Sequence, residues 1–295
     1  MTSSHSRPVL VGTDGSPGAR DAVVWAAREA TVRGRPLHLV QAVETQWPVG
    51  YLPGSIAEYP PEPDRDQIRE VLAEQLAAQA AELDQEVTTA LRDGPAADVL
   101  AAEAEAVEAE LVVVGGRGHS ALARTLLGST ASELLHVTSR PVIVVRGTAP
   151  GSCVVIGVGG LGGGDHAARF ALDFAARHKL PVRAVHGRAD SLFALVAERL
   201  TTEQRNAAAA EHDVVNAAVA AEVDAWRTAH PELDIQREEV DEQPVQALLD
   251  RAGDAALLVV GSRHRGALQR VILGSISHAV VHHAPVPVAV IREPG

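Results

Sequence analysis

The 295-residue sequence contains one cysteine, Cys153, which excludes an internal disulfide and a cysteine-based metal cluster. A chain without disulfides fits a reducing compartment, and we expect the protein to be cytoplasmic. Cys153 begins an apolar stretch and is most simply interpreted as a core residue.

Positive charge is scarce, because 26 Lys and Arg face 38 Asp and Glu, which gives a formal net charge of −12. Such a surface repels nucleic-acid backbones and anionic membranes. Residues 1–8 lack the pattern of a signal peptide, and no apolar run approaches the roughly 20 residues that span a bilayer. We therefore expect neither nucleic acid nor membrane as a partner, although a few backbone amides could still hold the phosphates of one nucleotide.

Several catalytic and metal-binding patterns are also missing or incomplete. The sequence contains no G-x4-G-K-[ST] loop and no G-x-S-x-G elbow, which argues against a P-loop NTPase and a serine hydrolase. His278 and His282 lie four residues apart on a predicted helix, with His283 beside them, and this spacing can chelate zinc. No third ligand is near in sequence, so we expect no zinc site. Because both catalytic motifs are missing, we also expect no catalytic residues.

The sequence repeats itself after about 145 residues. Residues 9–15, 22–30 and 36–43 return as residues 154–160, 167–175 and 181–188. Residues 115–146 and 261–292 are identical at 13 of 32 positions at an offset of 146. A duplication explains this best and predicts two domains, 1–148 and 151–295, joined by a short segment rich in small residues and proline.

Short runs of Val, Ile and Leu alternate with helical patterns in each half, which is typical of a parallel sheet wrapped by helices. Continuous apolar runs such as residues 111–114 indicate strands buried on both faces. The predicted strands of the first half are 8–13, 37–43, 86–91, 111–115 and 142–146, and its predicted helices are 17–33, 65–84, 96–108 and 129–138. The predicted fold class is α/β, with two tandem doubly wound domains that each have a five-stranded parallel sheet.

Three further segments have simpler interpretations. Trp25, with Phe170 at the equivalent position, is expected where the first helix of each half packs on the sheet. The acidic, Ala-rich stretches 66–84 and 203–229 are typical of solvated amphipathic helices. The proline-rich segment 46–64 cannot be regular structure, and it is either a variable surface excursion or a lid over the ligand crevice.

Ligands of open α/β sheets bind beyond the carboxyl ends of the strands, so the residues after the first and fourth strands matter most. Asp14 follows the first strand. Residues 115–118 (Gly-Gly-Arg-Gly) follow the fourth, and residues 128–130 (Gly-Ser-Thr) begin the next helix. Glycines allow close approach to an anion, and the helix start adds free N–H groups, two hydroxyls and a positive dipole end. Arg117 and Arg124 could add charge. The alternative is a glycine turn followed by a Ser/Thr cap, without any ligand.

In these motifs the sequence resembles the universal stress protein family in its actinobacterial tandem form, over nearly the whole chain. The pattern Val11-Gly-Thr-Asp-Gly-Ser16 opens the fold, and Arg140-Pro-Val-Ile-Val-Val145 closes the first half. Between them Gly115, Gly118, Gly128 and Ser129 match the G-x2-G-x9-G-S/T pattern of the ATP-binding variant. The resemblance implies an adenine nucleotide α-hydrolase-like fold that binds ATP, with Mg²⁺ accompanying the nucleotide, and regulates rather than turns over a substrate.

The resemblance also implies a role for each matched residue. Asp14 would contact the nucleoside or its bound metal, and Gly12 and the backbone near Ala42 would border adenine and ribose. Ribose and phosphates would be held by Gly115, Gly118, Gly128, Ser129 and Thr130. Family members typically dimerise through the last strand, so the chain would either form a homodimer or pair its two halves with each other.

The second half keeps this frame but changes two positions. Gly159 replaces Asp14 and cannot ligate Mg²⁺, and His264 replaces Gly118 and puts a ring where close backbone approach is needed. Four positions of the motif survive, namely Gly261, Arg263, Gly274 and Ser275. We therefore expect a weakened or altered anion site in the second half.

Residues 157–162 also match G-x-G-x-x-G, the fingerprint of dinucleotide sites. The acid expected about 20 residues further on is absent, and Asp190 comes too late. Because the repeat aligns this loop with residues 13–17, we interpret it as a decayed copy of the first-half loop.

These observations predict an ATP-binding regulatory protein of stress or growth adaptation. The nucleotide would order residues 115–130 and change a surface that another protein or a second chain recognises. Two alternatives stay open: a slow ATPase or nucleotidyl-transfer enzyme, and a dimerisation scaffold with a vestigial nucleotide site.

Overall fold

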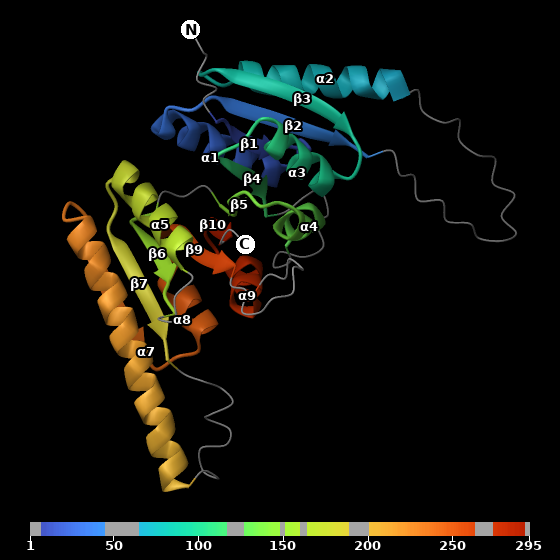
Figure 1. Cartoon of the computed structure of the whole chain (residues 1–295). Coiled ribbons are helices and arrows are strands. Elements are labelled where there is room, and N and C mark those ends of the chain that lie inside the picture. The colour runs from blue at the N-terminus through green and yellow to red at the C-terminus, as the bar shows by residue number, and fades with distance from the viewer. Residues whose placement is uncertain are drawn as a thin grey trace, which may run out of the picture.

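The computed structural model describes residues 7–44, 65–116, 127–147, 151–159, 164–188, 201–262 and 274–292. These residues form one ten-stranded sheet with the order β3-β2-β1-β4-β5-β10-β9-β6-β7-β8 and helices on both faces (Figure 1). Each half contributes five parallel strands, as predicted, and the two sets of strands meet at β5 and β10.

The first half alternates strands and helices along the chain. Its elements are β1 (Val9–Gly12), α1 (Pro17–Arg33), β2 (Leu37–Val43), α2 (Arg65–Ala81), β3 (Val87–Asp93), α3 (Ala96–Ala106), β4 (Leu111–Gly115), α4 (Ser129–Val137) and β5 (Val142–Val145). Every strand and helix predicted for this half is present, and no end differs by more than three residues.

The second half repeats this arrangement. Its elements are β6 (Cys153–Gly157), α5 (Asp165–His178), β7 (Val182–Gly187), α7 (Thr202–Ala229), β8 (Ile235–Val240), α8 (Pro244–Arg251), β9 (Ala255–Ser262), α9 (Ser275–His283) and β10 (Val288–Arg292). The helix before the edge strand differs most between the halves, because α7 has 28 residues and α2 has 17.

Local sequence signals explain where the helices begin and end. The Ser16 side chain accepts a hydrogen bond from the Ala19 N–H at the start of α1, and Pro17 occupies the first turn. Gly34 ends the helix in the left-handed conformation that glycine adopts at low cost. At α7, Thr201 and Gln204 form a capping box, which satisfies two backbone N–H groups of a long helix.

The sheet is buried on both faces, and each apolar cluster continues across the two halves. One cluster contains residues of α1, α2, α5 and α7, and the other contains residues of α3, α4, α8 and α9. Trp25 and Phe170 pack against the first cluster, and Trp25 also stacks on Phe174 of α5 with ring centroids 6.3 Å apart. The repeat boundary in the sequence is therefore not a boundary of the hydrophobic core.

The two halves are joined by antiparallel pairing of β5 with β10. Ile143 and Ala289, which are equivalent at the repeat offset of 146, pair with each other. Val142 pairs with Val290 and Val144 with Val288, so the local pairing is symmetric about the central pair. A pseudo-twofold axis therefore passes between Ile143 and Ala289, and the carboxyl ends of the strands point in opposite directions in the two halves.

Two equivalent arginines strengthen this junction. Arg146 donates a hydrogen bond from Nη1 to the His282 carbonyl oxygen, 2.6 Å away at the end of α9. Arg292 donates to the Leu135 carbonyl oxygen near the end of α4. Each half thus supplies a cation to the carbonyl end of a helix in the other half, where the helix dipole favours positive charge.

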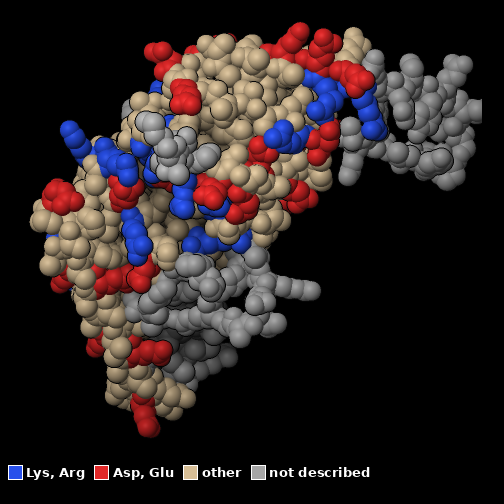
Figure 2. All heavy atoms as spheres, turned by 45° about the horizontal axis from the view of Figure 1, so that its top comes forward, with Lys and Arg blue, Asp and Glu red and all other residues tan. Residues whose placement is uncertain are grey.

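A polar cluster on the other face of the sheet also crosses the halves. Glu29 and Arg33 of α1 form a buried ion pair, and Arg33 Nη1 lies 2.6 Å from Glu110 Oε1. His178 of α5 contacts Glu29 through Nε2, 2.8 Å from Oε2, and the Arg33 guanidinium lies over the Phe170 ring. Figure 2 shows Lys and Arg beside Asp and Glu over much of one face of the described residues.

Cys153 is buried at the start of β6, which confirms its predicted place in the core. Burial raises the pKa of its thiol, so the neutral form is favoured. None of the helices in the described ranges is both long enough and apolar enough to cross a membrane.

Candidate functional site

The first-half crevice lies at the carboxyl ends of β1 and β4. β1 lies between β2 and β4, and the chain leaves it toward β2 and later returns on the other side as β4. Helix α1 packs on one face of the sheet, whereas α3 and α4 pack on the other. This is the switch point at which doubly wound sheets bind ligands.

Asp14 lies in the turn between β1 and α1 and is exposed. Its Oδ1 accepts a hydrogen bond from the Ser16 N–H at 2.9 Å, which places the carboxylate at the start of α1. The preceding residue, Thr13, is buried and donates from Oγ1 to Gln79 Oε1 of α2 at 3.2 Å. The loop after β1 therefore carries a carboxylate and is linked to α2 by a polar contact.

The glycines after β4 lie next to the start of α4. The Gly128 N–H donates to the Gly116 carbonyl oxygen at 3.1 Å, and the Gly116 N–H donates to the Val145 carbonyl oxygen at 2.8 Å. Gly128 is the N-cap of α4 and, as a glycine, supplies no side-chain cap. The structure thus brings Gly115 together with Gly128, Ser129 and Thr130, at a helix start where the N-cap residue leaves the first N–H groups uncapped.

At two of the predicted site positions, glycine is also required by the packing of the neighbouring helices. A Cβ at Gly115 would lie 2.6 Å from the Gly18 backbone, so β4 and α1 could not approach as they do. A Cβ at Gly12 would lie 2.7 Å from the Leu100 side chain of α3. Ala42 is partly buried near the end of β2 and packs against the apolar cluster under α3 and α4.

Some predicted site residues lie outside the described residues. These are Arg117 and Gly118 of the first half and Arg263 of the second, together with Arg124, His264, Asp190 and the proline-rich segment 46–64. The described part of the first-half site therefore consists of Asp14, Gly115 and the start of α4, with Gly12 and Ala42 beneath them.

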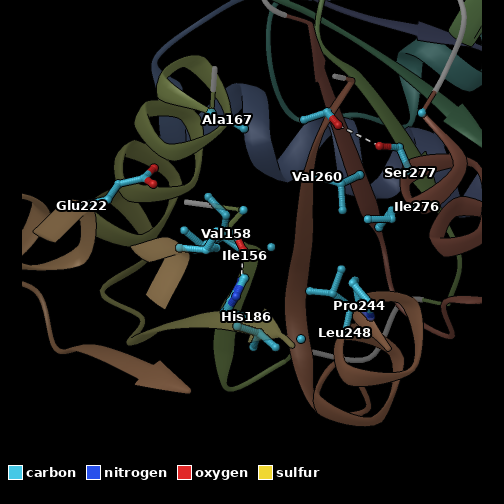
Figure 3. A pocket seen from close by; sticks show the side chains of 18 of the residues that line it. Ile156, Val158, Ala167, His186, Glu222, Pro244, Leu248, Val260, Ile276 and Ser277 are labelled. Atoms are coloured by element: carbon cyan, nitrogen blue, oxygen red, sulfur yellow. Dashed lines mark hydrogen bonds between the residues drawn. The ribbon is translucent and has the colours of Figure 1, made fainter. Parts of the chain in front are cut away.

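The second half contains a cavity of about 520 Å³ at the equivalent crevice, above the carboxyl ends of β6, β7 and β9 (Figure 3). It lies between α7 on one face of the sheet and α8 and α9 on the other. Three predicted second-half residues, Gly261, Gly274 and Ser275, line it together with Gly159. Its walls are mostly apolar and include Ile156, Val158, Val185, Trp226, Leu248 and Ile276.

Few polar side chains face this cavity. His186 of β7 is 8% exposed, and its Nδ1 donates to the Val158 carbonyl oxygen at 2.8 Å. Ser277 of α9 donates from Oγ to the Gly261 carbonyl oxygen at 2.7 Å (Figure 3). Glu222 of α7 lines the cavity from the opposite helix, and it is the acidic residue among the described lining residues.

Sequence reasoning missed the contribution of α7 and β7 to the second-half site. The stretch 203–229 is predicted to be a solvated amphipathic helix, and most of α7 is exposed, but the prediction does not say that Val219 and Val223 are fully buried or that Val215 and Trp226 line the cavity. These four residues form an apolar stripe at helical spacing, which would have identified the buried face of the helix. His186 had no comparable signal, because one histidine at the end of a strand is compatible with many roles.

The histidines of α9 lie close together. The His278 and His282 rings have centroids 4.3 Å apart, and Nε2 of His282 is buried without a hydrogen-bond partner in the described part of the chain. Burial, with the nearby charges of His278 and Arg146, lowers the pKa of His282. Within the described ranges no three His, Cys, Asp or Glu side chains are grouped so that they could hold a metal ion.

Comparison with known proteins identifies the family. The sequence pattern of the Universal stress protein family matches residues 5–146 and 153–292, once in each half. The chain belongs to the universal stress protein family. It is 32% identical over 295 residues to a universal stress protein of Mycolicibacterium smegmatis, covering 96% of both chains. It is 31% identical over 306 residues to one of Mycobacterium tuberculosis, covering 99% of both.

Solved structures of this family share the tandem fold. A universal stress protein from Archaeoglobus fulgidus superposes with a TM-score of 0.68 at 17% identity, covering 98% of this chain and 99% of that one. A universal stress protein from Pseudomonas aeruginosa superposes with a TM-score of 0.61 at 18% identity, covering 98% and 93%. At this level of identity the similarity establishes the fold.

Proposed function

We propose that this universal stress protein is a cytoplasmic ATP-binding regulator and that its first half holds the nucleotide. The observation that supports this best is the convergence of Asp14, Gly115 and the start of α4 at the switch point of the sheet. Main-chain N–H groups at a helix start bind phosphate oxygens, and glycine permits the close approach that this requires. The missing G-x4-G-K-[ST] motif fits this mode of binding, which needs no P-loop lysine.

Asp14 fits the role of a magnesium ligand. Mg²⁺ is usually held by one or two carboxylates together with phosphate oxygens and water, rather than by a cage of protein groups. Asp14 supplies one exposed carboxylate beside the crevice, and no further acidic cluster is needed. Bound Mg²⁺ would neutralise phosphate charge, while Ser129 and Thr130 would hold phosphate oxygens at the start of α4.

A regulatory role fits the described residues better than catalysis. The Asp14 side chain accepts a hydrogen bond from the Ser16 N–H and is thereby held at the start of α1, where a static carboxylate suits ligand binding. The last strand of each half pairs with the other inside the chain, so a homodimer would need a different surface. We propose that nucleotide occupancy changes a surface recognised by a second protein.

Nucleotide extraction from natively purified protein tests this proposal. We expect one ATP per chain, and we expect Asp14→Ala and Gly118→Leu to remove most of it. Normal nucleotide content in both variants would contradict the site. ADP accumulation at a rate that Asp14→Ala reduces would favour the enzyme alternative, and protein without nucleotide would favour the scaffold.

A further inference from the structure

We infer that the second-half cavity binds an uncharged aromatic compound of nucleoside size and discriminates against its triphosphate. This site is separate from the proposed ATP site, and the inference does not require ATP to bind the first half. It rests on the shape of the cavity, on its polar groups and on a direct comparison of the two crevices.

The size and walls of the cavity suit a small ring compound. Its volume of about 520 Å³ is within the range of pockets that bind small molecules. The Trp226 side chain forms part of one wall, and Val158 and Leu248 form apolar surface in the floor and the facing wall. An aromatic ligand would gain by stacking and by removing its own apolar surface from water.

The polar groups fit a neutral ligand with N–H groups. Because a carbonyl oxygen only accepts, His186 Nδ1 must carry the hydrogen that it donates to Val158. In the tautomer that carries its hydrogen on Nδ1, Nε2 is the acceptor, and the His186 side chain is buried and lines the cavity. Ser275, at the start of α9, can donate its hydroxyl to an oxygen at the opposite wall.

The comparison with the first half argues against a triphosphate. Gly159 stands where Asp14 stands, so the second crevice has no carboxylate at this position to hold Mg²⁺. The described lining residues include no Lys or Arg. A polyphosphate chain would therefore enter an apolar space without a described cation.

The same comparison shows how the ring-binding space arises. In the first half, Thr13 of the loop after β1 donates a hydrogen bond to Gln79 of α2. In the second half, Val158 replaces Thr13, and it shares the cavity wall with Trp226 of the corresponding helix α7. A polar contact is thus replaced by two apolar groups that line an open cavity.

Calorimetric titration of the full chain with adenosine, in the presence of saturating MgATP, tests the inference. Adenosine and ATP share one ring system and differ in charge, so they separate ring recognition from phosphate recognition. We expect adenosine to bind under these conditions and to change the fluorescence of Trp226. Loss of adenosine binding in MgATP, or no binding at millimolar adenosine, would overturn the inference.

Matched variants assign the binding to this cavity. We expect Val158→Thr with Trp226→Gln to weaken adenosine binding at least tenfold, and Thr13→Val with Gln79→Leu to leave it unchanged. Trp226→Phe should keep calorimetric binding while removing the fluorescence change, and Val158→Thr alone serves if the double variant does not fold. The inference fails if adenosine affinity follows the first-half variants. These results do not depend on whether ATP binds, so the two proposals can fail separately.

Discussion

The two halves of the chain share a backbone frame but differ in the chemistry of their crevices. The first crevice contains Asp14, and beside it Thr13 is hydrogen-bonded to Gln79 of α2. The second contains glycine at the position of Asp14 and has an apolar cavity beside Trp226. After duplication, side chains at the ends of the strands can therefore diverge without changing the strands that position them.

Packing beneath the crevices shows what has been kept. Gly12 allows Leu100 of α3 to approach β1, and Gly157 allows Leu248 of α8 to approach β6. Both leucines are 3% exposed. The two glycines thus preserve the same contact between a strand and a helix, although the residues just after them differ.

The largest effect is expected where the halves depend on each other. Glu29→Gln removes one acidic partner of buried Arg33 and should destabilise the whole chain by about 3 kcal/mol. This value is at the low end for a broken buried ion pair, because Arg33 keeps its contact with Glu110. Urea unfolding should show one cooperative transition in the wild type and the variant. The control is Glu105→Gln, which removes an exposed partner of Arg140 and should cost less than about 1 kcal/mol. Two separate transitions would show that the halves do not share a core.

The shared packing predicts a second difference between the halves. Leu100→Ala should destabilise the protein by roughly 2–5 kcal/mol, because it leaves a new void beneath Gly12. Leu248→Ala should cost less, because Leu248 already borders a cavity and loses fewer contacts. The measurement is the denaturant midpoint of unfolding of each variant, compared at an unchanged slope of the unfolding free energy against denaturant concentration. A greater loss for Leu248→Ala would contradict the open cavity.

Ligand binding should distinguish the two crevices more directly than stability does. Asp14→Ala should weaken MgATP binding roughly 10- to 100-fold, as expected for the loss of a charged contact worth about 1.5–3 kcal/mol. Adenosine binding to the second half should not change. Asp98→Ala, which removes an exposed carboxylate of α3, is the matched control for overall charge. Equal losses of both ligands would indicate a single shared site.

The smallest effect concerns pH. The pKa of His282 lies below its ordinary value of 6.5, mainly because of burial, so the folded protein binds this proton less readily than the unfolded chain. Its contribution to stability should be fully present above about pH 6.5 and lost as the pH falls through the lowered folded pKa. His282→Gln should flatten this part of the stability profile. The repeat-equivalent His136 is exposed, and His136→Gln is the control. An unchanged profile in His282→Gln would contradict this role.

The strands and helices could be predicted closely because their signals are local. The apolar run from Leu111 to Val114 indicates a strand buried on both faces, and Ser16 and Gly34 mark the ends of α1. The family resemblance implied that the last strands could pair within the chain, but the residues alone did not give the pairing of Ile143 with Ala289, because β5 and β10 show only that they are apolar strands. Which strand edges meet depends on how two complete domains fit together.

The candidate site was predictable only in part. The motif placed Asp14 and Gly115 at the ends of adjacent strands, where the structure also has them. It gave no information about Trp226 and Glu222, which reach the second crevice from a helix far along the chain. The sequence shows which face of a helix is apolar but not what that face contacts. The residues of α7 that line the cavity could therefore be identified only from the structure.

The nucleotide content of natively purified protein tests the central claim, that the two crevices bind different ligands, most directly. Denaturing extraction followed by chromatography should give one ATP per chain for the wild type and close to none for Asp14→Ala. Two ATP per chain in the wild type, with one retained in Asp14→Ala, would contradict the claim and show that both halves bind the same nucleotide.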